Sequence, residues 1–298
     1  HRNRCSRESA SIGTMSHSVA LLLVAGFALL LPRAAAAGDA ARGAELFAIA
    51  AGCGCHTPDN GPVGAGGGEV PTPFGTFYGT NITPDPETGI GAWSDAEIAA
   101  AIRGGSLRDG SVESPAMPYY RYAGMADADV ADLIAYLRSL PPVRRENRPH
   151  DVALPFARLG YRAWRLLFAP TVAAPATAPA AGLERGRYLA DHVAICGDCH
   201  TPRDFFGVPE ETLYHAGTGD GPEGADVPNI TPHATGVGDW DAGDMMALLT
   251  YGMLPNFDNV QGWMAHVIDG RGGGPGYAKA PETDIRLISE YVLSVPPI

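Results

Sequence analysis

Apolar residues recur at the spacing of one helical face in two distant segments of the chain. The apolar positions of these segments are Val130, Leu133, Ile134 and Leu137 in the first, and Ile285, Ile288, Val292 and Val295 in the second. Residues three and four apart face the same side of a helix, so each segment is predicted to be an amphipathic helix. No run of alternating apolar and polar residues is long enough to predict a strand.

Further helices are predicted from the residues that start and stop them. One helix is expected to open near Asp39, and its counterpart near Leu183. Another begins at Ser94, where a glutamate three residues on completes a capping box, and Asp241 with a following aspartate occupies the matching place. The glycines expected to end these last two helices are Gly104, Gly105 and Gly252.

Short motifs occur twice along the chain in the same order. Cys-His-Thr-Pro appears at 55–58 and 199–202, Asn-Ile-Thr-Pro at 81–84 and 229–232, and Tyr-x-x-Ser-x-Pro-Pro at 136–142 and 291–297. Such a repeat indicates two copies of one domain. We therefore predict an all-α protein in which each copy has three helices and long loops. The predicted boundaries are 38–143 and 182–298, with a linker that contains a short helical segment at 144–181.

The first residues have the layout of an export signal. Thirteen consecutive apolar residues, Val19–Leu31, end at a proline and are followed by the small residues Ala35–Ala37. A membrane-spanning helix needs about twenty apolar residues, so a cleaved signal is favoured over an uncleaved anchor. Residues 1–37 are interpreted as the signal and the residues upstream of it, which predicts a periplasmic protein.

Composition and charge narrow the function further. The 298 residues are 45% hydrophobic and 18% charged, which is typical of a globular protein. The formal net charge is −12, and it becomes −15 when residues 1–37 are removed. The chain has 20 arginines and one lysine, Lys279, without a basic tract. This charge pattern argues against nucleic-acid binding.

Cys196, Cys199 and His200 form the motif C-x-x-C-H, which is typical of covalent haem c attachment. Two thiols one helical turn apart can add to the two vinyl groups of one porphyrin, and the adjacent histidine then faces the iron. The alternatives are a redox dithiol, which would need a βαβ setting, and half of a zinc site, which would need two further ligands nearby. The motif therefore predicts haem c with His200 as the proximal ligand.

The first copy has a contracted version of this motif. Cys53 and Cys55 are separated by one residue, and His56 follows directly. The number of positions from the helix start to the histidine is thirteen, counted from Gly43, and fourteen in the second copy, counted from Gly186. A second haem is expected here, with His56 as proximal ligand, attached through Cys55 alone or through both cysteines in a strained loop. Loss of this haem is the alternative.

Two methionines are candidates for the sixth iron ligand, a position that methionine occupies in many cytochromes. Met117 follows Ser94 by 23 positions, and Met264 follows Asp241 by the same number. This equality selects them over the other methionines, although a methionine near aromatic residues can also fill a core, and Met253 and His266 compete with Met264. We therefore predict Met117 and Met264 as distal ligands.

The chain resembles the c-type cytochrome subunits of bacterial membrane-bound alcohol, gluconate and related sugar dehydrogenases. The segments that carry the resemblance are 71–76, 81–91 and 115–119, together with 154–156 and 163–168 in the connection between the copies. The resemblance implies two class I cytochrome c folds, histidine and methionine ligation, and electron transfer from a dehydrogenase. The chain departs from the family in its contracted first motif and in having two haem domains, where those subunits usually have three.

The sequence thus favours a periplasmic dihaem carrier that takes electrons from a dehydrogenase subunit toward a respiratory acceptor. It would bind no nucleic acid, and it would reach the membrane, if at all, through a partner. One alternative is a dihaem enzyme, such as a peroxidase or a thiosulfate-oxidising cytochrome, which would need a displaceable iron ligand. Another is a carrier with one haem, whose first domain serves docking.

Overall fold

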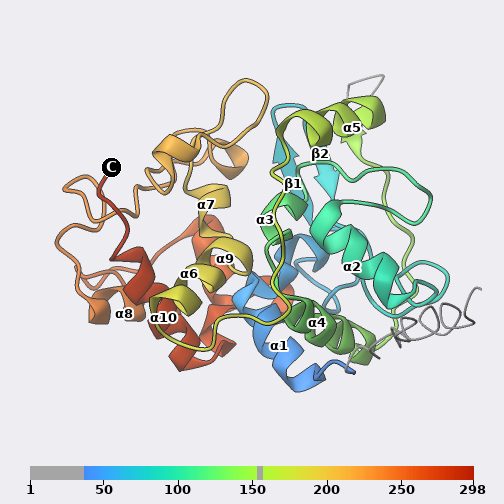
Figure 1. Ribbon diagram of the computed structural model, residues 1–298, viewed down its shortest axis with the longest axis horizontal. Coiled ribbons are helices and arrows are strands. Elements are labelled where there is room, and N and C mark those ends of the chain that lie inside the picture. Colours follow the sequence, from blue (N-terminus) through green and yellow to red (C-terminus); the bar gives the residue numbers. More distant parts are fainter. Residues whose placement is uncertain (1–36, 153–156) are drawn as a thin grey trace, which may run out of the picture. The chain divides into compact units, whose positions relative to one another are not determined.

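Six helices, three from each copy of the repeat, form the frame of the structure (Figure 1). Those of the first copy are α1 (Ala40–Ile49), α2 (Asp95–Gly104) and α4 (Asp127–Ser139). Those of the second copy are α6 (Gly182–His192), α8 (Ala242–Tyr251) and α10 (Glu282–Val292). All six lie where the capping residues and the apolar spacing place them, which confirms the predicted helices.

The computed structural model describes residues 37–152 and 157–298. The predicted export signal, apart from Ala37, and the motif at 154–156 therefore lie outside the described residues. Ala37–Ile298 pack as one compact unit, so the structure does not separate the two copies into two units. The domain boundaries stay predictions.

The predicted helix caps are present in both copies. The Ser94 hydroxyl accepts a hydrogen bond from the Glu97 amide at 3.3 Å, and the Glu97 carboxylate accepts one from the Ser94 amide at 2.7 Å. Asp241 and Asp244 make the same reciprocal pair at 2.9 and 3.0 Å. At the other end, α2 and α8 are closed by left-handed glycines at 105 and 252. Local chemistry thus fixes both ends of these helices.

Shorter helices connect this frame. They are α3 (Tyr119–Tyr122), α5 (Ala157–Phe168), α7 (Cys196–Cys199) and α9 (Gly262–Asp269), with the 3-10 turns η1 (Ala51–His56), η2 (Glu211–Leu213), η3 (Pro222–Gly224), η4 (Arg271–Gly273) and η5 (Tyr277–Lys279). The helix α5 is the short helical segment expected in the linker. An Ala/Pro-rich tract, residues 170–181, follows α5. It is hydrogen-bonded to the start of α4, because the carbonyls of Pro175 and Ala176 accept from the amides of Asp127 and Ala128.

A small antiparallel sheet lies between the first motif and α5 in Figure 1, although no alternating run was long enough to predict its strands. Its strands are β1 (Glu69–Thr72), β2 (Gly75–Tyr78) and β3 (Asp151–Val152), in the order β1-β2-β3. Glu69 lies opposite Tyr78, and Gly75 lies opposite Val152. Strands of four and two residues are too short to carry an alternating pattern. The protein nevertheless remains predominantly helical.

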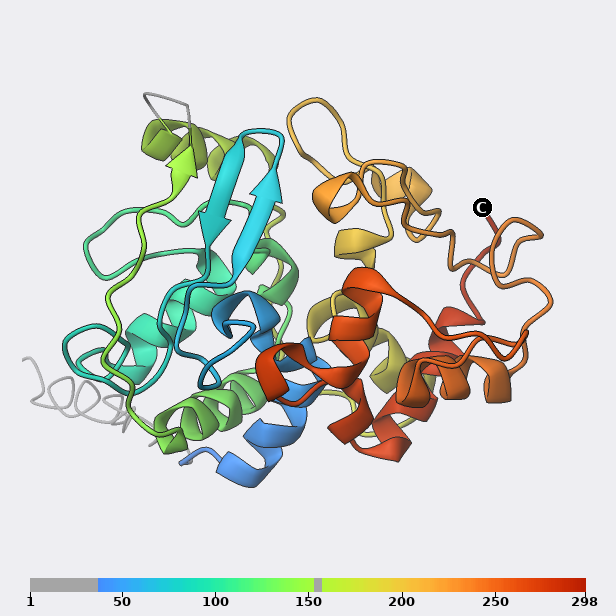
Figure 2. The same ribbon diagram turned by 180° about the vertical axis from the view of Figure 1, so that it is seen from behind.

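The core is built on two helix pairs, α1 with α4 and α6 with α10 (Figure 2). The predicted apolar face of α4 is buried, as are three of the four positions named for α10: Val130, Leu133, Ile134, Leu137, Ile285, Ile288 and Val292. Polar contacts then join the copies: the Tyr188 hydroxyl on α6 donates to Asp129 on α4 at 2.8 Å. The same hydroxyl accepts a hydrogen bond from the Ala126 amide. In addition, the buried apolar residues of the two copies form one continuous core.

Among the helices of the described residues, none combines the length and the hydropathy that crossing a membrane requires.

Candidate haem-binding sites

The complete motif of the second copy forms a single helical turn. Cys196 and Cys199 are the first and last residues of α7, and His200 follows as the residue that ends it. The turn starts from Ile195, which is in the left-handed conformation with φ of 51°. Gly197 inside the turn is close-packed, because a Cβ there would collide with the ring of Tyr214. The two thiols are thus held three positions apart on one turn, as the haem motif requires.

A backbone carbonyl fixes the orientation of the His200 ring. The Nδ1 atom of His200 lies 2.8 Å from the carbonyl oxygen of Pro228. A carbonyl only accepts hydrogen bonds, so Nδ1 is the protonated nitrogen and Nε2 carries the lone pair. Burial lowers the pKa of His200, with the carbonyl contact acting in the opposite direction. A neutral imidazole with an oriented second nitrogen is the form that binds a metal.

The contracted motif of the first copy holds its histidine in the same way. The Nδ1 atom of His56 lies 2.8 Å from the carbonyl oxygen of Thr80, and burial lowers the pKa of His56. Thr80 and Pro228 each precede the repeated Asn-Ile-Thr-Pro sequence. The carbonyl that orients each histidine therefore comes from the same repeated loop.

Backbone hydrogen bonds show that the two motifs are in register from the histidine onward. The amide of Gly66 donates to the carbonyl of His56 at 2.8 Å, and the amide of Gly217 donates to that of His200 at the same distance. The hydroxyl of the next residue, Thr57 or Thr201, accepts from a backbone amide in both copies. Cys55 therefore corresponds to Cys199.

The first motif is one residue shorter than the second, and the backbone compensates for this difference before Cys55. Three successive residues, Ala51, Gly52 and Cys53, have positive φ angles of 53°, 63° and 45°. Only one residue, Ile195, is left-handed at the matching place in the second copy. Residues other than glycine adopt this conformation at a cost, so Cys53 sits in a strained turn that Cys196 lacks.

All four cysteines of the motifs are free thiols in the structure. Burial raises the pKa of Cys53, Cys196 and Cys199 to about 12 in each case. Burial likewise raises the pKa of Cys55. A zinc site would need further ligands beside the cysteines, and among the described residues no group of three or more Cys, His, Asp or Glu side chains is placed to hold a metal ion.

The predicted methionine ligands occupy different kinds of element. Met117 lies in a turn before α3, where its amide donates to the carbonyl of Ser114. Met264 lies in the first turn of α9 and packs against the core. Both side chains are partly buried. Their assignment as iron ligands stays a prediction.

The two candidate sites are neighbours. Helix α9, which carries Met264, packs against η1, which carries the first motif. Near this contact, Arg271 forms an ion pair with Asp59 at 2.6 Å. Gly52 is needed there, because a Cβ would collide with the carbonyl of Pro275. Segments from the end of the chain thus cover the haem-attachment turn near its beginning.

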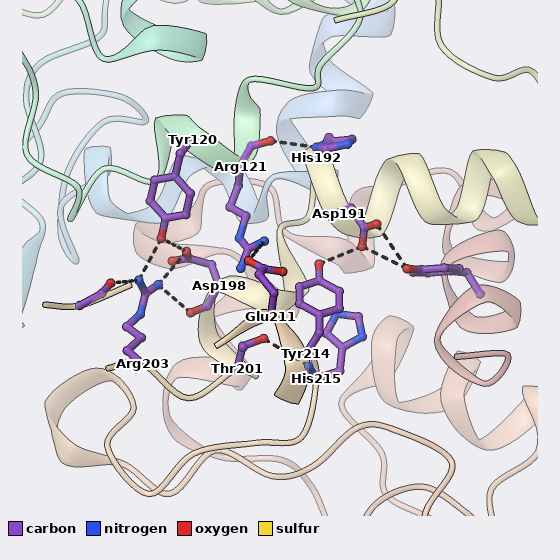
Figure 3. A network of polar contacts seen from close by, with 12 residues as sticks. Tyr120, Arg121, Asp191, His192, Asp198, Thr201, Arg203, Glu211, Tyr214 and His215 are labelled. Carbon is purple, nitrogen blue, oxygen red and sulfur yellow. Dashed lines mark hydrogen bonds and ion pairs between the residues drawn. The ribbon is translucent and has the colours of Figure 1, made fainter. Parts of the chain in front are cut away.

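A polar network around the second motif was not predicted from the sequence (Figure 3). Tyr120, from the first copy, donates to Asp198 at 2.6 Å, and Arg203 donates to the same carboxylate at 2.7 Å. Asp198 lies between the two cysteines of the motif. The first copy thus contributes directly to the surroundings of the second motif, through contacts that only folding creates.

Haem c fits the residues of both motifs. Each copy supplies a neutral, oriented imidazole and a thiol directly before it, and the second copy supplies two thiols at the required spacing. The site therefore has the ligand set of a c-type cytochrome.

The comparison with protein families agrees. Residues 40–141 match the family described as Cytochrome c. The chain is also 39% identical to a protein named Diheme cytochrome c-type from Cereibacter sphaeroides, over 96% of this chain and 99% of the relative. The protein belongs to the cytochrome c family, its cofactor is haem c, and its activity is electron transfer.

Other relatives are subunits of dehydrogenases. The chain is 34% identical, over 94% of its length, to the cytochrome c subunit of alcohol dehydrogenase (quinone) from Gluconacetobacter polyoxogenes. It is 38% identical, over 70% of its length, to the gluconate 2-dehydrogenase cytochrome c subunit from Pantoea cypripedii. The chain spans 61% and 50% of these two relatives.

Proposed function

We propose that this protein is a periplasmic carrier with two haem c groups, which receives electrons from a dehydrogenase subunit and passes them toward a respiratory acceptor. The observation that carries the proposal is that His56 and His200 are oriented in the same way. The Nδ1 atom of each ring is hydrogen-bonded to a backbone carbonyl oxygen at 2.8 Å. Both copies therefore present a histidine whose Nε2 carries the lone pair that iron would bind.

The residues of the chain have distinct roles in this proposal. His56 and His200 offer Nε2 to iron, while Thr80 and Pro228 keep the rings from rotating. Met117 and Met264 are the proposed distal ligands. When bound, the haem supplies one-electron redox chemistry, and the contact between α9 and η1 keeps the two sites adjacent. A fully ligated iron favours electron transfer over catalysis at the metal.

Counting haem groups tests the proposal. A pyridine haemochrome assay on the purified protein, combined with a protein mass, should give two haem groups per chain. A value of one would support the alternative in which the first copy only serves docking.

The dehydrogenase partner is proposed from the relatives. The chain should co-purify, from the organism that makes it, with a dehydrogenase. Adding the substrate of that dehydrogenase should reduce the haem groups, which is seen as a sharpening of their visible absorption bands. Alcohols, gluconate and fructose are the first substrates to try, because the relatives act in dehydrogenases for these compounds. A cytochrome that purifies alone, and that no such dehydrogenase reduces, would contradict this part.

Periplasmic location is proposed from residues 1–37. Fractionation of cells should recover a protein that begins near Gly38. An intact N-terminus in the cytoplasmic fraction would show the export prediction to be wrong.

A further inference from the structure

Two matching hairpins follow corresponding helices of the two copies. The first hairpin, residues 104–113, starts at the end of α2, and the second hairpin, residues 251–260, starts at the end of α8. In each hairpin the amide of the fourth residue donates to the carbonyl of the eighth, at 3.0 Å in the first and 2.8 Å in the second. The amide of the tenth residue donates to the carbonyl of the second residue at 2.8 Å in both. The two hairpins therefore correspond position by position.

The first hairpin is covered by a helix of the same chain. Arg165 on α5 donates to the carbonyl of Gly104 at 3.0 Å and to the hydroxyl of Ser106 at 2.9 Å. Arg162, also on α5, donates to the carbonyl of Gly110 at 3.0 Å. Small residues at these three positions leave the hairpin backbone open to the arginines. In the first copy, this hairpin is thus already a docking site.

The second hairpin has large apolar side chains at the same three positions. They are Tyr251, Met253 and Phe257, which are 75%, 37% and 84% exposed. Helix α5, which covers the first hairpin, lies away from α8 in Figures 1 and 2. We call the side chains of Tyr251, Met253 and Phe257 the hairpin patch. It is an exposed apolar patch at a place where the first copy makes a contact.

The backbone at Phe257 shows that this residue does not serve the folding of the chain. Phe257 has a φ angle of 63°, in the left-handed region, where the first hairpin has Gly110 with a φ angle of 77°. A bulky residue adopts this conformation at a cost that glycine does not incur. Because the Phe257 ring is exposed, packing within the described residues does little to offset that cost. Strain of this kind is concentrated at functional sites.

The chain around the hairpin patch is strongly acidic. Residues 204–270 contain eleven acidic residues and no lysine or arginine. Within the part of the chain that the structure describes, one of these eleven carboxylates forms an ion pair, that of Glu211 with Arg121 at 3.0 Å. Asp258 lies in the second hairpin itself, and its carboxylate accepts a hydrogen bond from the neutral amide of Asn259, which leaves its charge in place. A basic surface would compensate this negative charge.

The hairpin patch is also close to the segment that carries the proposed ligand of the second haem. The second hairpin ends at Val260, two residues before α9 begins, and α8 and α9 are in contact. Met264 lies in the first turn of α9. A molecule seated on the hairpin patch would therefore lie beside the helix that holds this methionine.

We propose that the hairpin patch docks a redox partner protein that has a basic surface and recesses for the rings of Tyr251 and Phe257. The proposal rests on the proposed function, because it makes this partner one that exchanges electrons with the second haem. Aromatic residues and methionine are enriched at protein interfaces, and tyrosine is frequent among the residues that dominate binding. A second copy of this acidic chain, or an anionic membrane, would instead be repelled by the carboxylates around the patch.

Photo-cross-linking of the full-length, haem-loaded protein tests the proposal. Phe257→p-benzoylphenylalanine places a light-activated group in the hairpin patch, and the protein is then mixed with an extract of the organism that makes it. We expect an adduct with one other protein that carries a redox cofactor. Mass spectrometry should locate the adduct in a segment where lysine and arginine outnumber aspartate and glutamate. The yield should fall as salt rises, because the charge attraction is screened.

Two pairs of variants control for exposure and for charge. Phe205→p-benzoylphenylalanine should give no adduct with this partner, although Phe205 is 89% exposed, because its neighbour Phe206 stacks on Phe168 of α5. Asp258→Lys, added to the labelled protein, should lower the adduct yield about fivefold or more at low salt. Asp226→Lys is the matched charge reversal, next to the η3 turn that packs on β1, and should change the yield less than about twofold.

Four outcomes would overturn the proposal. They are the absence of an adduct, an adduct with a second copy of the chain, an adduct with lipid, and an adduct on an acidic or neutral segment of another protein. Equal yields from the Asp258 and Asp226 variants would contradict the role of charge. The haem content of the same sample, and its reduction by a dehydrogenase, are measured separately. A protein with two haem groups that a dehydrogenase reduces, but that gives no adduct, would keep the proposed function and exclude this docking site.

Discussion

His215 occupies, in the second copy, the backbone position that Gly64 has in the first. Both amides donate to the hydroxyl oxygen of the threonine after the haem-binding histidine, and both carbonyls accept from the isoleucine amide of the repeated loop. Both residues have positive φ angles, 75° for Gly64 and 69° for His215. The His215 ring is fully buried, and neither of its nitrogens has a hydrogen-bond partner among the described residues. Such a ring is stable only when neutral.

The pH dependence of stability should reveal this histidine. Burial lowers the pKa of His215 from 6.5 to about 3, with the nearby His200 and Arg121 acting in the same direction. Between these pH values the unfolded chain binds a proton that the folded protein excludes, so stability falls as pH falls through this window. Asparagine tolerates positive φ and does not titrate. Urea unfolding of His215→Asn should therefore show a flatter pH profile from about 6 to 4. An unchanged slope would contradict the assignment.

The two cysteines of the contracted motif should differ in importance. Cys55 keeps the register of Cys199, whereas Cys53 lies in a left-handed turn. Cys55→Ser should remove covalent haem from the first copy, and Cys53→Ser should leave it attached. Denaturing electrophoresis with haem staining, or a mass of the intact chain, distinguishes them. Loss of haem only from the Cys53 variant would show that the motifs are aligned wrongly.

Met117 should be a ligand of one haem only. Met117→Ala is expected to abolish the weak long-wavelength charge-transfer band of methionine-ligated ferric iron for one haem and to lower the reduction potential of that haem. Met125→Leu is the control, because Met125 is fully buried in the core and was not selected by the spacing. A full-strength band in the Met117 variant would exclude this residue as the ligand.

At the scale of helices, one carboxylate joins three of them. Asp284 on α10 receives two hydrogen bonds of 3.0 Å from Arg185 on α6, and Arg42 on α1 donates to it at 3.2 Å. The side chain of Asp284 is 8% exposed. Burial alone would raise the pKa of Asp284, but Arg185 and Arg42 outweigh this effect and hold it below its usual value. The carboxylate therefore links the two copies only while it is ionised.

Removing this charge should destabilise the whole unit. Breaking a buried ion pair costs about 3 to 5 kcal/mol, so Asp284→Asn should lower the free energy of unfolding by a few kcal/mol at neutral pH. A depressed carboxyl pKa contributes stability that is lost as pH falls below about 4, so the variant and the wild type should converge there. Glu290→Gln, which breaks an exposed pair with Arg286, should cost less than about 1 kcal/mol. Equal effects of both changes would argue against a joining role.

Helix boundaries could be predicted because their causes are local. The Ser94 and Asp241 caps and the glycines at 105 and 252 act within a few residues of each helix end. The sheet could not be predicted, since β3 pairs with β2 across more than seventy residues. The haem-binding histidines were recognisable from their motifs. The carbonyls of Thr80 and Pro228 were not recognised, although the repeated sequence that follows them was a usable signal.

At the scale of the whole molecule, negative charge should govern encounter with partners. The chain without residues 1–37 carries a net charge of −15. Charges more than about 10 Å apart are screened at 0.1 M salt. If a basic patch on the electron donor steers docking, reduction by that donor should slow as ionic strength rises from about 10 to 300 mM. Stopped-flow measurement of haem reduction tests this. A rate that stays flat or climbs would mean that docking uses an apolar contact instead.

The packing of α9 and of the loop with Arg271 and Pro275 against the first motif has a consequence for the order of folding and haem attachment. Chains are made from the N-terminus, so Asp59 is synthesised before its ion-pair partner Arg271, which follows 212 residues later. Pro275 and α9, which also approach η1, arrive at the same late stage. In an incompletely folded chain the turn that carries Cys55 is not yet covered by α9 and by the segment around Pro275. We therefore expect haem to attach to the first motif faster in such a chain than in the folded protein without haem, in which these segments close the turn.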